Sequence, residues 1–194
     1  TILMNLLLFP YVQMIPVIAR ETLGVSEGLT GLLMGADGLG AIVGAIAIAS
    51  AGSVRHHGRI FVGGSFVGLV MAFVFANSGT YSISLPVLIG LGFGASGFGT
   101  MQGTIVVLAA SDGMRGRALG AVSLAIGAGP IGALIIGAIA EATSPATAIK
   151  LLSGTGVAAI ILAGLLMSAL RNPTEAHVTS GSADAAESNA RPAA

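Results

Sequence analysis

The chain has 194 residues, of which 54% are hydrophobic and only 8% are charged, and its formal net charge is zero. Because a soluble domain needs about a quarter of its residues charged to hydrate its surface, this composition excludes an ordinary soluble protein and indicates a chain surrounded mainly by lipid. The balanced charge gives no sign of nucleic-acid binding, and the absence of cysteine excludes disulfides and thiolate metal sites.

Six apolar runs follow one another along the chain, each about as long as the 20 residues that cross a bilayer as a helix. They cover residues 2–19, 30–50, 60–77, 84–110, 118–140 and 149–170. Glycine, proline or charged residues separate the runs, as is typical of loops. The sequence therefore predicts an all-α membrane protein, with a six-helix transmembrane bundle over residues 1–170. Residues 171–194 are rich in small and polar residues and are expected to form a disordered tail.

Positive residues favour one side of the predicted membrane. They occur in the second loop, in the fourth loop and after the last span, as Arg55, Arg59, Arg115, Arg117 and Arg171. Positive loops stay in the cytoplasm, so we expect a multi-pass protein of the plasma or inner membrane with a cytoplasmic C-terminus. The chain starts at a threonine and is apolar at once, without the charged region of a signal peptide. We therefore expect it to be the C-terminal piece of a longer protein.

The first span carries a polar and aromatic stripe. Asn5, Phe9 and Gln13 are four residues apart and share one helical face, while Pro10 and Pro16 favour kinks. One interpretation is that this face lines a substrate cavity. The other is that the two amides only form hydrogen bonds between helices.

The second span contains an acid, Asp37, within LLMGADGLGAIVG. An ionised carboxylate near the bilayer centre costs about 2.5–3.5 kcal/mol on insertion scales, and no Lys, Arg or His of this chain is predicted at that depth. Removal from water favours the protonated form of a carboxyl group, which suits a proton carrier. Asp37 is therefore a candidate for proton coupling, as a group in the transport cavity or in contact with a missing half. The alternative is a neutral structural acid bonded to a carbonyl.

The fourth span contains GLGFGASGFGTMQGT at residues 90–104. Ser96 and Thr100 are four residues apart and become candidates for the substrate cavity. The glycines favour close helix packing over ligand contact. The run is not a phosphate-binding loop, because no strand precedes it and no lysine follows in the required spacing.

The fifth span begins after a charged loop and contains a GP pair. Gly129, Pro130 and Gly132 predict a helix bend, which is either a pivot for rocking motions or a packing seam. In the preceding loop, Asp112 can pair with Arg115.

The charged loop residues Arg59, Asp112, Arg115 and Arg117 form either a cytoplasmic gate or simple determinants of topology. The pair His56 and His57 lacks a third ligand nearby, so no metal site is expected. Neither a matched acid pair nor a nucleophile with its base occurs in the spans, so we expect no enzyme activity and no cofactor.

The segment RGRALGAVSLAIGAGPIGALIIGAIAE, residues 115–141, resembles the junction before the eleventh helix of major facilitator superfamily transporters, in the drug, macrolide and siderophore exporter branch. Residues 52–59 are similar to the loop motif of the same superfamily: Gly52, Gly58 and Arg59 fit, whereas Arg55 and His56 replace an acid and an arginine. Over residues 1–170 the resemblance is to the C-terminal half of such a transporter.

The resemblance implies secondary active, proton-coupled efflux of a small amphipathic molecule by alternating access. It places the first and fourth helices at the cavity, and the second and fifth helices against a missing N-terminal six-helix half. The expected partners are the lipid bilayer, the small-molecule substrate, protons and that missing half. The alternative function is a split, non-transporting six-helix subunit that works only with a partner half.

Overall fold

The computed structural model describes residues 1–51 and 56–166, which form helices and short connections without a strand. The predicted tail, 171–194, lies outside the described residues, as does Arg55. Six segments are long and apolar enough to cross a membrane. The prediction of an all-α, six-helix membrane protein is therefore confirmed.

The first span consists of two short helices, α1 (Ile2–Leu7) and α2 (Tyr11–Glu21). The next three spans are single helices, and the fifth is again divided. In order, the remaining helices are α3 (Glu27–Ser50), α4 (His57–Asn77), α5 (Tyr81–Ala109), the 3-10 turn η1 (Asp112–Met114), α6 (Arg115–Ile126), α7 (Gly129–Ala142) and α8 (Pro145–Leu166).

Two interruptions divide spans at prolines that the sequence singles out. Pro10 has no backbone N–H, and the chain leaves regular α-helix geometry just before it, where the Phe9 amide donates to the Met4 carbonyl over 3.1 Å. Pro16 remains inside α2. In the fifth span α6 ends at Ile126 and α7 begins at Gly129, one residue before Pro130. The predicted bend therefore lies at the very start of α7.

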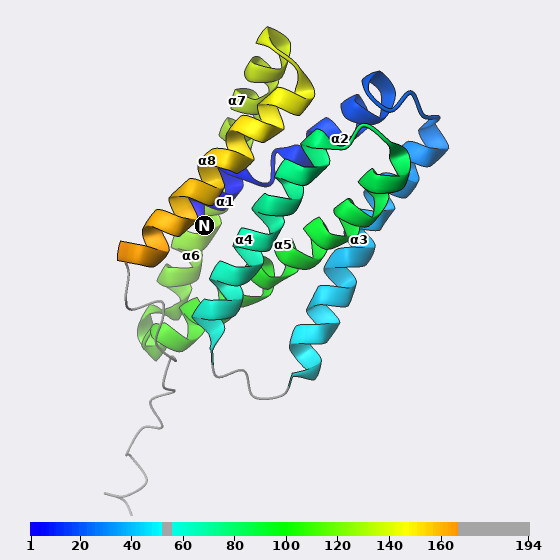
Figure 1. The fold of residues 1–194 in the computed structure, drawn as a ribbon. Helices are drawn as coiled ribbons and strands as arrows, with labels where there is room; N and C mark the ends of the chain where they lie inside the picture. Colours follow the sequence, from blue (N-terminus) through cyan, green and yellow to red (C-terminus); the bar gives the residue numbers. More distant parts are fainter. Residues whose placement is uncertain (52–55, 167–194) are drawn as a thin grey trace, which may run out of the picture.

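Helix α5 lies between α3 and α4, and glycines bring the three backbones close together (Figure 1). A Cβ atom at Gly92 would fall on the carbonyl oxygen of Asp37 in α3. One at Gly94 would fall on the amide of Gly68 in α4. These glycines therefore act in helix packing, as small residues do in membrane bundles.

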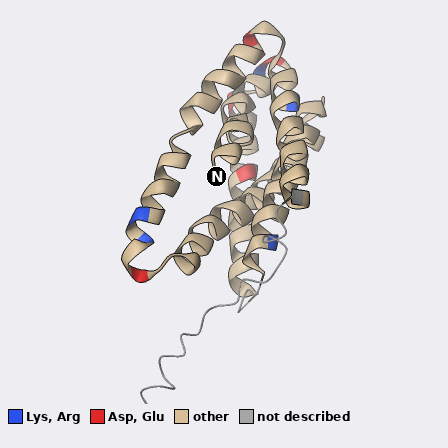
Figure 2. Ribbon diagram, turned by 90° about the vertical axis from the view of Figure 1, so that its left-hand side faces the viewer, with Lys and Arg blue, Asp and Glu red and all other residues tan. Residues whose placement is uncertain are grey.

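The core is built from large aliphatic and aromatic side chains of all six spans, with Leu33 from the second and Ile136 from the fifth. Leu8, Ile15, Phe75, Leu88 and Ile149 are each at most 1% exposed. Charged positions lie mostly near the ends of the bundle (Figure 2). The fifth span is the least buried, because no residue of α6 is buried.

Candidate functional site

A groove runs along the interruption of the first span, on the side that faces α7. Its cavity volume is about 580 Å³. The first span contributes Asn5, Phe9, Pro10 and Gln13, and α7 contributes Gly129, Pro130, Ala133 and Leu134. The structure thus brings the predicted stripe of the first span together with the predicted bend of the fifth.

A different cavity, of about 370 Å³, lies between α3, α4 and α5.

Gly132 lets α7 pack directly against the break between α1 and α2. A Cβ atom there would come within 2.8 Å of the Asn5 carbonyl oxygen and 2.8 Å of Pro10 Cγ. Gly132 is therefore a packing contact, while Gly129 and Pro130 face the groove itself. The two interrupted spans meet where each departs from regular helix geometry.

The groove combines one aromatic wall with two amides. The Phe9 ring packs against Phe98 of α5, with centroids 5.6 Å apart. The Asn5 side chain is buried, and its amide donates to the Thr1 carbonyl over 3.1 Å. Gln13 is exposed, and within the described part of the chain its side chain makes no hydrogen bond. Gln13 is thus available to a ligand.

Asp37 has a partner within the chain that the sequence analysis missed. The Tyr11 hydroxyl donates to Asp37 Oδ1 over 2.8 Å. Tyr11 is 3% exposed and Asp37 is half-buried. Among the described residues Asp37 forms no ion pair. Within the described part of the chain, the carboxylate of Asp37 is therefore bonded by a phenol and not by a cationic side chain.

The interruption at Pro10 sets the position of Tyr11. Tyr11 is the first residue of α2 and points toward α3, whereas Phe9 and Pro10 line the groove toward α7. Asp37 itself is not part of the groove lining. One peptide bond, between Pro10 and Tyr11, therefore connects the groove with the Tyr11–Asp37 pair.

The family profile of the Major Facilitator Superfamily matches residues 1–193. The chain belongs to the Major Facilitator Superfamily. Membership indicates a membrane transporter, and the six apolar helices agree with a multi-pass membrane protein. No curated protein and no solved structure gave a significant match.

Two predicted cavity residues of this superfamily member lie elsewhere. Ser96 faces Gly44 of α3, and its hydroxyl donates to the Phe93 carbonyl over 2.7 Å. It lines the cavity between α3, α4 and α5. Thr100 is exposed on α5 and lines neither cavity. The structure does not bring Ser96 and Thr100 together with Asn5, Phe9 and Gln13, because Ser96 packs toward α3 and Thr100 is exposed.

The charged loop residues of the transporter lie at the ends of its spans. Asp112 and Arg115 form an ion pair over 2.8 Å, with side chains 88% and 48% exposed. Arg117 and Arg59 are exposed in the first turns of α6 and α4. Within residues 1–51 and 56–166, no cluster of three or more His, Cys, Asp or Glu side chains is arranged to hold a metal ion.

Replacing Arg115 with glutamine is expected to change the stability of the transporter by less than about 1 kcal/mol, because exposed ion pairs contribute little. Thermal unfolding of the purified protein in detergent measures this effect. A much larger loss would show that Arg115 has a second partner besides Asp112.

Proposed function

We propose that the chain is the C-terminal half of a secondary active exporter in the plasma or inner membrane, which moves a small amphipathic molecule by alternating access in exchange for protons. The groove between the two interrupted spans carries this proposal. It combines amides, an aromatic ring and a helix bend in one place. Interrupted helices in a membrane protein are tolerated where they line a cavity.

The lining of the groove favours an amphipathic substrate. Phe9, Pro10, Ala133 and Leu134 offer apolar surface, and the amides of Asn5 and Gln13 offer hydrogen bonds, but no lining residue is charged. A phosphorylated or strongly charged molecule would lose its hydration there without a counter-charge. The volume of about 580 Å³ lies within the roughly 300–1,000 Å³ range of small-molecule sites.

A second six-helix half would close the open side of this groove. Gln13 is exposed there, and Leu134 on the opposite rim is 75% exposed. A polar amide facing hydrocarbon is costly, whereas one facing a central cavity is not. This arrangement supports a missing N-terminal half as the partner of α7 and of the first span.

Asp37 is the proposed proton-coupling residue, and Tyr11 is proposed to position it. Tyr11, which donates this hydrogen bond, directly follows the groove residue Pro10 in the chain. Movement of the interruption on substrate binding would therefore change the surroundings of Asp37. Arg59, Asp112, Arg115 and Arg117 are the proposed cytoplasmic gate, on the side where the tail is also proposed to lie.

The full-length protein, reconstituted in liposomes with an imposed proton gradient, tests the proposed function. Fluorescent amphipathic cations and neutral amphiphiles are suitable probes. Gradient-dependent movement of at least one probe is expected, together with proton movement in the opposite direction. Transport that is indifferent to the proton gradient would contradict proton coupling, and no transport of any amphiphile would contradict the substrate class.

Gln13→Ala is expected to raise the KM of transport about 3- to 10-fold with little change in kcat, because one neutral hydrogen bond contributes about 0.5–1.5 kcal/mol. Concentration-dependent uptake into inverted vesicles measures both constants. Thr100→Ala is the matched control, since Thr100 lies outside the groove. Equal KM values for the two variants would remove Gln13 from the substrate site.

A further inference from the structure

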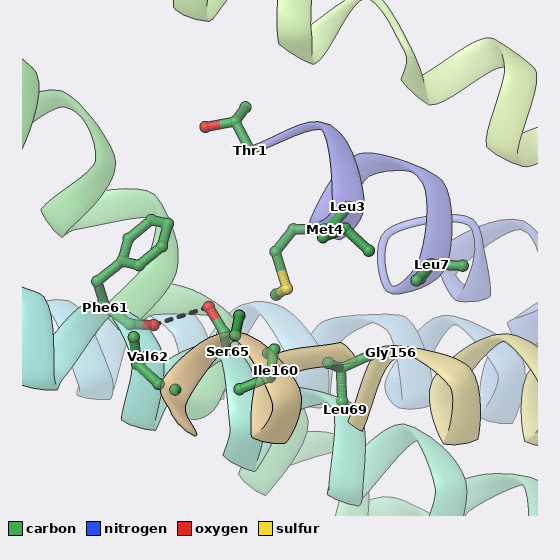
Figure 3. A pocket seen from close by; sticks show the side chains of 12 residues that line it. Thr1, Leu3, Met4, Leu7, Phe61, Val62, Ser65, Leu69, Gly156 and Ile160 are labelled. Carbon is green, nitrogen blue, oxygen red and sulfur yellow. Dashed lines mark hydrogen bonds between the residues drawn. The ribbon is translucent and has the colours of Figure 1, made fainter. Parts of the chain in front are cut away.

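A second, smaller cavity lies between α1, α4 and α8, away from the groove (Figure 3). Its volume is about 230 Å³. Apart from Thr1 and Ser65, its lining is apolar or glycine: Leu3, Met4, Leu7, Phe61, Val62, Leu69, Gly156, Ile160, Ala163 and Gly164. The cavity is below the roughly 300 Å³ at which sites for drug-sized ligands begin.

The two hydroxyl groups of this cavity already have partners. The Ser65 hydroxyl donates to the Phe61 carbonyl over 2.7 Å, as the dashed line in Figure 3 marks. The Thr1 hydroxyl donates to Gln102 Oε1 over 3.2 Å. The cavity therefore favours an apolar occupant, because a polar ligand would find few free hydrogen-bonding groups.

Another cavity, of about 350 Å³, lies along the same two helices, α4 and α8. Val62, Ile160 and Gly164 line both cavities, so the two meet at the α4–α8 seam. The remaining lining of the 350 Å³ cavity includes Ile161 and Leu165, which are 50% and 72% exposed. On a membrane-spanning helix, such exposed aliphatic side chains face hydrocarbon.

The seam is tight at one end and loose at the other. A Cβ atom at Gly156 would come within 2.6 Å of Leu69 Cδ2, so the helices touch there. A Cβ atom at Gly164, two turns further along α8, would meet nothing within 4 Å. The space at Gly164 therefore connects the lipid-facing cavity with the inner one.

We propose that a bilayer lipid inserts one acyl chain between α4 and α8, past Gly164, into the 230 Å³ cavity that Met4 lines. The chain would supply the dispersion contacts that the apolar lining lacks when the cavity is vacant. The site is separate from the substrate groove, and the proposal does not depend on the transported molecule or on proton coupling.

The test uses the full-length protein in nanodiscs that contain phosphatidylcholine with a diazirine at the end of one acyl chain. After illumination, peptide mass mapping locates the labelled residues. We expect adducts on Met4, which is only 4% exposed and is reached through the cavity. Gly164→Phe is expected to reduce Met4 labelling at least fivefold, because the ring fills the seam.

Leu162→Phe is the matched control, since Leu162 is 58% exposed on the same helix and lines neither cavity. It should leave Met4 labelling unchanged. Wild-type labelling confined to Ile161, Leu162 and Leu165 would overturn the proposal, as would undiminished Met4 labelling in a folded Gly164→Phe variant. The wild-type result decides the matter if Gly164→Phe does not fold.

Discussion

Asp37→Asn is expected to lower proton-gradient-driven transport at least tenfold while leaving substrate exchange without a gradient largely intact. Asparagine has nearly the same shape, and its carbonyl oxygen can accept the hydrogen bond that Tyr11 donates to Asp37 Oδ1. It cannot take up or release a proton at the pH of the assay. The fold should therefore persist while coupling is lost, and the two transport modes of one liposome preparation measure the difference.

Glu27→Gln is the control for this substitution, because Glu27 is an exposed acid in the first turn of the same helix, α3. It should retain gradient-driven transport. The double variant Tyr11→Phe with Asp37→Asn should transport no worse than Asp37→Asn alone if Tyr11 acts through Asp37. Normal gradient-driven transport by Asp37→Asn would assign the acid a structural role only.

The spans and their interruptions follow from local sequence. Apolar length determines the six helices, and Pro10 and Pro130 mark where the first and fifth spans are divided. Both effects are local, since they depend on hydrocarbon thickness and on a missing backbone donor. Pro16 nevertheless stays inside α2, so a proline alone does not predict that a span divides.

The pairing of Tyr11 with Asp37 depends on how two helices are rotated against each other. A signal was nevertheless present, because Tyr11 precedes the first loop by about as many residues as Asp37 follows it, which places both at similar depth. The lack of a cationic side chain at this depth does not exclude a phenol as the hydrogen-bond donor. Ser96 was predicted to line the substrate cavity, but it faces Gly44 of α3. A regular spacing along one helix does not reveal which neighbouring helix that face contacts.

Gly92→Ala is expected to destabilise the protein by about 1–3 kcal/mol, the usual cost of overpacking a close contact. The added Cβ would fall on the carbonyl oxygen of Asp37 and within 2.9 Å of the Ala41 amide nitrogen. Both are backbone atoms of α3 and cannot rotate away, so α5 must move. Because the displaced carbonyl belongs to Asp37, the hydrogen bond with Tyr11 should weaken too. Thermal unfolding in detergent, followed by circular dichroism, measures the loss.

Gly99→Ala is the matched control in the same helix, since a Cβ atom there would meet nothing within 4 Å. Alanine favours a helix over glycine by up to about 1 kcal/mol, so this variant should be neutral or slightly more stable. The opposite signs of the two stability changes distinguish the effect of packing from that of helix propensity. If both variants unfold at the same temperature, the close approach of α5 to Asp37 does not stabilise the bundle, and the position of the acid must depend on other contacts, such as the hydrogen bond with Tyr11.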